Sequence, residues 1–96
     1  MIDERTIENI LATANIVEVV SEFVPLLKLG ENYVGMCPFH KDKNPSMFVS
    51  TSKGVFKCFT CGEGGNAVQV LMKYRQMNYN EAFRWLAKKY NIVIPR

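Results

Sequence analysis

Three cysteines and one histidine stand in two closely spaced pairs. Two residues separate Cys37 from His40, two separate Cys58 from Cys61, and seventeen lie between the pairs. These four are all the cysteines and the only histidine of the chain. Zinc takes sulfur and nitrogen donors at four tetrahedral corners, and a two-residue spacer lets one tight turn aim both ends at the same ion. The pattern therefore predicts one zinc ion bound by Cys37, His40, Cys58 and Cys61.

The predicted zinc is structural, because four protein ligands leave no open coordination position for water or substrate. A zinc deaminase would carry His-x-Glu ahead of Pro-Cys-x-x-Cys, and neither pair does. A thioredoxin-like role for Cys58 and Cys61 lacks the expected strand-helix-strand context. A hydrolytic triad would need a histidine that is not already assigned to the metal. No catalytic residue is therefore expected in this chain.

The glycine-rich segment 62–66 invites comparison with phosphate-binding loops. It lacks the Gly-Lys-Ser/Thr ending that places a lysine on the phosphates and a hydroxyl on magnesium. Glycines also serve where a turn needs unusual backbone angles, and asparagine caps helices well. We therefore expect this segment to close the second metal-binding turn and to lead into a helix capped by Asn66.

Length and composition indicate a small soluble domain. The chain has 96 residues, of which 48% are hydrophobic and 22% charged. No apolar run approaches the roughly 18 residues of a membrane span, and no signal peptide opens the chain, so a cytoplasmic protein with no membrane partner is expected. Reduced cysteines fit that compartment. The formal net charge is +3 and falls to about +2 with zinc on three thiolates, so charge alone does not establish a nucleic-acid partner.

Helices are expected at both ends of the chain. Apolar residues recur with helical spacing in two short segments before Pro25 and in two more after residue 66. Glu18 and Glu81 stand three residues after their caps, as in a capping box. The four predicted N-caps are Asp3, Asn15, Asn66 and Asn78.

A small antiparallel sheet is expected between the helices. Short strand-like runs separated by turn residues lie at 26–29, 33–36, 47–50 and 55–58. The fold class is thus small α+β, a zinc ribbon with an antiparallel β-sheet flanked by N-terminal and C-terminal helices. Residues 1–96 are expected to form one zinc-binding domain, with 92–96 as the start of a linker in a longer protein.

Lysines and aromatic rings alternate on the predicted ribbon. In strand 55–58 and the residue after it, Cys58 must point to the metal, so Phe56 shares its side, whereas Val55, Lys57 and Phe59 point the other way. Lysines with aromatic rings suit single-stranded nucleic acid, because cations bind phosphates and rings stack on bases. The alternative is that the rings belong to the core and the lysines form a solvated rim.

Several ordered motifs resemble the N-terminal zinc-binding domain of bacterial DNA primases of the DnaG type. They are Cys-Pro-Phe-His at 37–40, Lys-Asn-Pro-Ser at 43–46, Lys-Cys-Phe-Thr-Cys-Gly at 57–62 and Gly-Asn-Ala at 65–67. The likeness covers nearly the whole chain, from the helix at 16–20 to Leu86 and Ala87.

The resemblance implies a role in DNA replication. Such a domain would bind single-stranded template DNA at priming sites and assist the primase catalytic core, in cis or in trans, in making RNA primers. Mg²⁺ is expected only in that core, which this chain lacks, and a replicative helicase would be contacted through an absent C-terminal domain. The candidate template-binding residues are Lys28, Tyr33, Lys43, Lys53, Phe56 and Lys57.

Two other functions are compatible with the same ribbon. The sheet could dock a partner protein, which would make the chain a protein-interaction module. The chain could also be the zinc domain of a phage-type primase-helicase.

Overall fold

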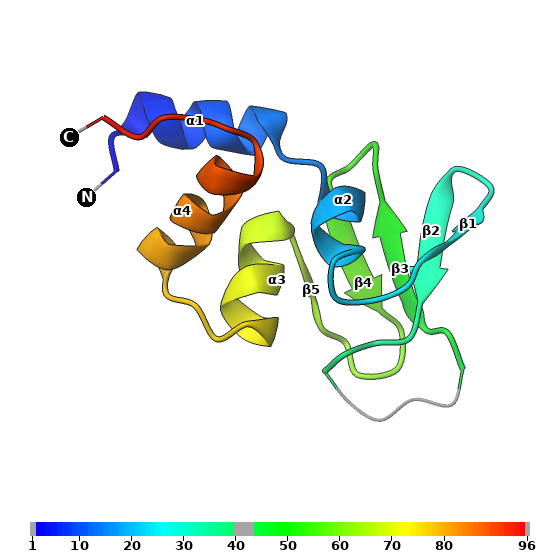
Figure 1. Ribbon diagram of the computed structural model, residues 1–96. Helices are drawn as coiled ribbons and strands as arrows, with labels where there is room; N and C mark the ends of the chain where they lie inside the picture. Colours follow the sequence, from blue (N-terminus) through cyan, green and yellow to red (C-terminus); the bar gives the residue numbers. More distant parts are fainter. Residues whose placement is uncertain (1, 40–43, 96) are drawn as a thin grey trace.

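The chain forms a small antiparallel sheet with helices before and after it in sequence (Figure 1). The computed structural model describes residues 2–39 and 44–95. The elements are α1 (Glu4–Thr13), α2 (Ile16–Val20), β1 (Leu27–Leu29), β2 (Asn32–Gly35), β3 (Met47–Ser50), β4 (Val55–Cys58), β5 (Gly64–Gly65), α3 (Ala67–Tyr74) and α4 (Tyr79–Lys89). The predicted α+β fold class is confirmed.

Each helix begins after its predicted cap. The Asp3 carboxylate accepts the Thr6 backbone N–H, satisfying a donor that has no partner within the helix. Asn66 and Asn78 form complete capping boxes, in which the side chain three residues on accepts the N–H of the cap. Polar caps therefore set the starts of α1, α3 and α4.

The fourth cap, Asn15, differs from the predicted capping box. Its side chain accepts the backbone N–H groups of Val17 and Glu18, but the Glu18 side chain does not return to it. Instead, the Asn15 N–H donates to the Tyr90 hydroxyl at 3.0 Å, and that hydroxyl donates to the Glu18 carboxylate at 2.7 Å. A tyrosine at the end of α4 thus completes the cap of α2, a contact between residues 75 apart in sequence.

The sheet has the strand order β1-β2-β3-β4-β5, with every neighbouring pair antiparallel. The first four strands match the predicted runs within one or two residues. The fifth was not predicted, because two glycines carry no alternating pattern; Gly64 and Gly65 pair with Lys57 and Phe56. The segment predicted to close a turn therefore also adds a short edge strand.

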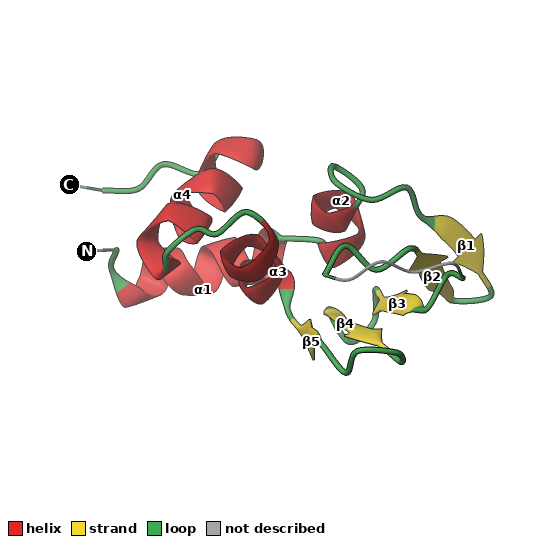
Figure 2. Cartoon of the chain, turned by 90° about the horizontal axis from the view of Figure 1, so that it is seen from below, coloured by secondary structure: helices red, strands yellow, loops and turns green. Residues whose placement is uncertain are grey.

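The two faces of the sheet differ in burial. On one face, Met47, Val49, Phe56 and Cys58 are at most 2% exposed, because α2 and α3 pack against them. In the described residues no helix covers the other face, as Figure 2 shows for β3 and β4. We call the first the inner face and the second the outer face.

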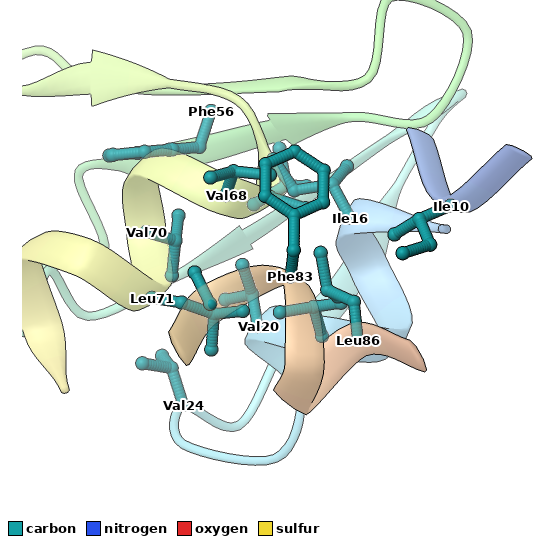
Figure 3. Close-up of a cluster of buried hydrophobic side chains, with 14 of the residues drawn as sticks. Ile10, Ile16, Val20, Val24, Phe56, Val68, Val70, Leu71, Phe83 and Leu86 are labelled. Atoms are coloured by element: carbon teal, nitrogen blue, oxygen red, sulfur yellow. The ribbon is translucent and has the colours of Figure 1, made fainter. Parts of the chain in front are cut away.

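The core continues from the inner face into the helices. Figure 3 shows Phe56 of the sheet near Val68 of α3, with Phe83 and Leu86 of α4 reaching toward Ile16 and other residues of the N-terminal helices. The molecule is elongated, with extents of 45 × 26 × 18 Å. The sheet lies at one end and α1 and α4 at the other, with α2 and α3 between them (Figure 1). In the part of the chain that the structure describes, the sheet therefore packs on the helices through its inner face.

The segment after α4 stays in contact with the core. Asn91 has a positive φ of 57° and the Ile92 N–H donates to the Ala87 carbonyl at 2.8 Å, which ends the helix in a Schellman motif. Ile92 and Ile94 pack against the core, whereas Val93 is 84% exposed. That a linker begins at 92–96 stays a prediction.

We expect Tyr90→Phe to lower the free energy of unfolding by about 1 kcal/mol, because it removes the hydroxyl that serves Asn15 and Glu18. Chemical denaturation measures the change. Tyr79→Phe is the matched control, since Tyr79 is half exposed and its ring contacts Phe83. Equal stabilities for the two variants would contradict the role given to Tyr90.

The same contact predicts a loss of stability at alkaline pH. Burial raises the pKa of Tyr90 above its ordinary value of 10.0, and the Glu18 carboxylate beside it adds to the effect. A raised folded-state pKa means that the contribution is fully present below pH 10 and is lost as the pH rises through the folded value. Urea midpoints between pH 9 and 12 should fall more steeply for the native sequence than for Tyr90→Phe. If the urea midpoints of the two proteins fell equally steeply with pH, this prediction would be wrong.

Candidate metal centre

Three cysteines from different parts of the ribbon come together beside the sheet. The register places Gly35, Met47 and Cys58 side by side on β2, β3 and β4. Cys37 follows β2 by two residues, and Cys61 lies in the turn after β4, so both are led back toward Cys58. The three sulfur atoms lie within 4.8 Å of one another.

The sulfur spacing fits a shared metal ion. Zinc–sulfur bonds of about 2.3 Å at tetrahedral angles place two sulfurs about 3.8 Å apart. The Cys37 and Cys61 Sγ atoms are 3.7 Å apart, whereas a disulfide would hold them at about 2.0 Å. Soft thiolate donors at this distance suit zinc, and the group can hold such an ion.

Backbone hydrogen bonds shape the second metal-binding turn. The Gly62 N–H donates to the Cys58 carbonyl at 3.0 Å, and the Cys58 N–H donates to the Glu63 carbonyl at 2.8 Å. The Cys61 N–H points at the Cys58 sulfur at 3.5 Å. Gly62 has a φ of +80°, where a side chain would be strained, and this reversal leads the chain into β5. The turn is thus formed by its backbone and holds both sulfurs on one side.

The buried sulfurs are held close to one another. Burial, together with the neighbouring thiols of Cys58 and Cys61, raises the pKa of Cys37 to about 12. A thiol in such surroundings keeps its proton at neutral pH unless a cation stabilises the thiolate. His40, the predicted fourth ligand, lies outside the described residues, so its role stays a prediction.

The candidate template-binding residues do not all share one surface. Lys57 is exposed on the outer face, and Lys53 lies in the turn between β3 and β4 beside it. Lys28 and Tyr33 pair with each other across β1 and β2, and the register places them on the same side as Phe56. Lys43 lies outside the described residues. Of the candidates in the described residues, Lys53 and Lys57 alone are brought together on the outer face.

The prediction that Phe56 contacts the template needs correction. Its side chain is 2% exposed and packs in the core, 5.8 Å from the Phe39 ring between centroids. A ring enclosed in this way has no free face on which a base could stack. For this residue the alternative, that aromatic rings of the ribbon form the core, is right.

Two other aromatic rings lie where Phe56 was expected. Phe59 is 70% exposed, and its ring meets that of Phe48 edge to face, with centroids 5.1 Å apart. Phe48 stands opposite Lys57 across β3 and β4. The alternation that points Phe59 away from the metal was visible in the sequence, whereas nothing there paired it with Phe48.

A shallow hollow of about 200 Å³ lies between these groups. Its lining residues include Phe48, Phe59, Lys53, Lys57, Val55, Asn32 and Ser50. Aromatic, cationic and amide groups therefore meet in one place on the outer face.

No helix in the described parts of the chain has both the length and the apolar composition needed to cross a membrane.

If the zinc ion is structural, its removal by a chelator should destabilise the ribbon, because the free energy of metal binding contributes to the free energy of folding. We expect excess chelator to lower the thermal midpoint and to reduce the β signal in circular dichroism, and added zinc to restore both. Elemental analysis must confirm that the metal has left. An unchanged spectrum and midpoint after confirmed metal loss would rule out a structural role.

The chain is similar to DNA primases along almost its whole length. It is 45% identical over 94 residues to a DNA primase of Clostridium acetobutylicum, and 41% identical over 96 residues to one of Neisseria meningitidis. These matches cover 98% and 100% of this chain, but the chain spans only 16% of either relative.

A solved structure has the same fold. The crystal structure of the Aquifex aeolicus primase, comprising zinc-binding and RNA polymerase domains, matches with a TM-score of 0.87 and 43% sequence identity. The match covers 94% of this chain and 22% of that one. The family model described as a CHC2 zinc finger matches residues 2–96. The chain therefore belongs to the CHC2 zinc finger family, and its fold is that of the zinc-binding domain of DNA primases.

Proposed function

We propose that this chain binds one structural zinc ion through Cys37, His40, Cys58 and Cys61 and presents the outer face of its sheet to single-stranded template DNA. In doing so it assists a primase catalytic core in starting RNA primers. The family and the whole-chain similarity to DNA primases support this function over the protein-interaction and primase-helicase alternatives. The observation that carries it is the group formed by the exposed Phe59, the half-buried Phe48 and two lysines on the outer face.

The outer face has the groups that single-stranded DNA requires. Phe59 and Phe48 offer aromatic surface for base stacking, which is sequence-tolerant because every base has a π face. Lys57 and Lys53 line the same hollow as the two rings. The face is not needed for the core, since the helices pack on the other side. It is therefore available to a ligand.

The charges of these two lysines remain available for phosphates. Within the described residues, ion pairs join Lys73 to Glu63 and Lys89 to Glu22, and neither Lys53 nor Lys57 pairs with a carboxylate. The Lys57 ammonium donates to the Gly62 carbonyl at 3.2 Å, which keeps it beside the metal-binding turn. A local pair of cations can bind phosphates although the net charge of the chain is small.

Zinc would act here by fixing the shape of the DNA-binding surface. Phe59 lies between Cys58 and Cys61, so an ion held by both cysteines limits the positions open to the ring. The chain's own residues bind and orient the template. Polymerisation, with its Mg²⁺, is proposed to take place in a separate catalytic core acting in cis or in trans. A helicase contact is proposed for a further domain of the parent protein.

Binding of short fluorescent single-stranded DNA, followed by anisotropy, tests the proposed face. We expect Phe59→Ala to weaken binding by about 1–3 kcal/mol through lost stacking. Lys53→Gln and Lys57→Gln should each weaken binding and reduce the slope of log K against log salt by about 0.7, the value for one phosphate of a single strand.

Controls from the far end of the molecule make the test specific. Lys88→Gln removes an exposed charge from α4, and Tyr79→Ala removes a half-exposed ring from the same helix. Both should bind like the native sequence. If the variants of the outer face bound no more weakly than these controls, with the same salt slope, the proposed surface would be wrong. Binding of a protein through apolar docking would show little salt dependence.

A further inference from the structure

A buried serine lies against one of the proposed zinc ligands. Ser46 directly precedes β3, and the structure leaves it 8% exposed. Its hydroxyl oxygen is 3.4 Å from the Sγ of Cys58, whose side chain is fully buried. Its backbone carbonyl accepts the N–H of Phe59 at 3.1 Å. One residue thus contacts the ligand through its side chain and the exposed aromatic residue through its backbone.

The direction of the side-chain hydrogen bond follows from the chemistry of the ligand. A cysteine that binds zinc is a thiolate, which has no proton and can only accept. The Ser46 hydroxyl must therefore donate. The Cys61 backbone N–H, 3.5 Å from the same sulfur, is a second donor. Among the described residues, the Ser46 hydroxyl and the Cys61 N–H thus both lie against this buried sulfur.

We propose that Ser46 is a positioning residue for the metal centre, whose hydroxyl orients the Cys58 thiolate and sets the strength of its bond to the ion. The inference rests on the ligand assignment proposed above. A hydrogen bond to a thiolate stabilises its charged form, which is the form that binds zinc. The same bond lowers the energy of the sulfur lone pairs, and so raises the energy of charge transfer from the sulfur to a bound metal ion. Both effects are largest in a buried site, where water cannot replace the donor.

The serine at the other end of β3 provides a matched control. Ser50 ends β3, and its hydroxyl bonds to the Ser52 hydroxyl and the Lys53 backbone N–H in the turn at the other end of the strand. Ser46→Ala and Ser50→Ala therefore remove the same atom from the two ends of one strand. Ser46→Thr keeps the hydroxyl, and Ser46→Val has the shape of threonine without it.

Titration of the full chain with Co²⁺ tests the inference, because the sulfur-to-cobalt charge-transfer band reports directly on the thiolates. We expect Ser46→Ala to shift this band to lower energy and to weaken zinc binding about 10- to 100-fold in competition with a chromogenic chelator. Ser50→Ala should change neither value. Ser46→Thr should have a band energy and a zinc affinity closer to the native values than those of Ser46→Val. This comparison distinguishes the effect of the hydroxyl from the effect of packing.

The outcomes distinguish this inference from the proposed ligand set. If the native chain failed to bind one tetrahedral Co²⁺, the ligand assignment and the role of Ser46 would both be overturned. If the native chain bound Co²⁺ but Ser46→Ala matched Ser50→Ala in band energy and zinc affinity, the role of Ser46 alone would be wrong. The same conclusion would follow if Ser46→Thr and Ser46→Val behaved alike. All spectra are recorded on the metal-bound chain, so an apo form that fails to fold does not prevent the comparison.

Discussion

The convergence of three sulfurs depends on the register of three strands. Because Gly35, Met47 and Cys58 are neighbours across β2, β3 and β4, the turns that follow β2 and β4 deliver their cysteines to the same place. A slip of one residue would send Cys58 to the outer face and Phe59 to the inner one. Gly35 helps to hold this register, since an added Cβ would lie 2.8 Å from the Pro25 carbonyl and from a methyl group of Leu26. The strand pairing and the metal centre therefore support each other.

The alternation of side chains along each strand also gives the two faces of the sheet different roles. The inner face holds Val49 and Phe56 against the helices and places Cys58 at the metal centre. The outer face holds Phe48 and Lys57, which contribute little to the core. A substitution on the outer face can therefore change binding with little effect on folding. The reverse holds for the inner face, where cavities in a small core are costly.

Local patterns in the sequence predicted most of this architecture. Helix caps and the cysteine spacing depend on residues three or four positions apart. The caps Asn66 and Asn78 were therefore predicted correctly, and Cys58 and Cys61 lie close together as expected. Strand alternation likewise gave the side on which Lys57 lies. These features need no knowledge of distant contacts.

Features that depend on tertiary contacts escaped prediction. The alternation rule already placed Phe56 beside Cys58, yet whether that side was covered by helices could not be known from the strand alone. The pairing of Phe48 with Phe59 needed the register of β3 and β4, and the cap of Asn15 needed Tyr90 from the far end of the chain. The Gly64–Gly65 strand had no side chains from which a pattern could be read. Long-range packing accounts for the first three differences, and the absence of a side-chain pattern accounts for the fourth.

The bond between Tyr90 and the start of α2 has a further geometric consequence. It keeps α4 beside the N-terminal helices, so both ends of the described chain emerge together at the end of the molecule opposite the sheet (Figure 1). A fluorophore, an affinity tag or a tether to a surface can thus be attached at either end without crowding the outer face. In a fused protein, the same arrangement would place the sheet at the end of the domain farthest from the point of attachment.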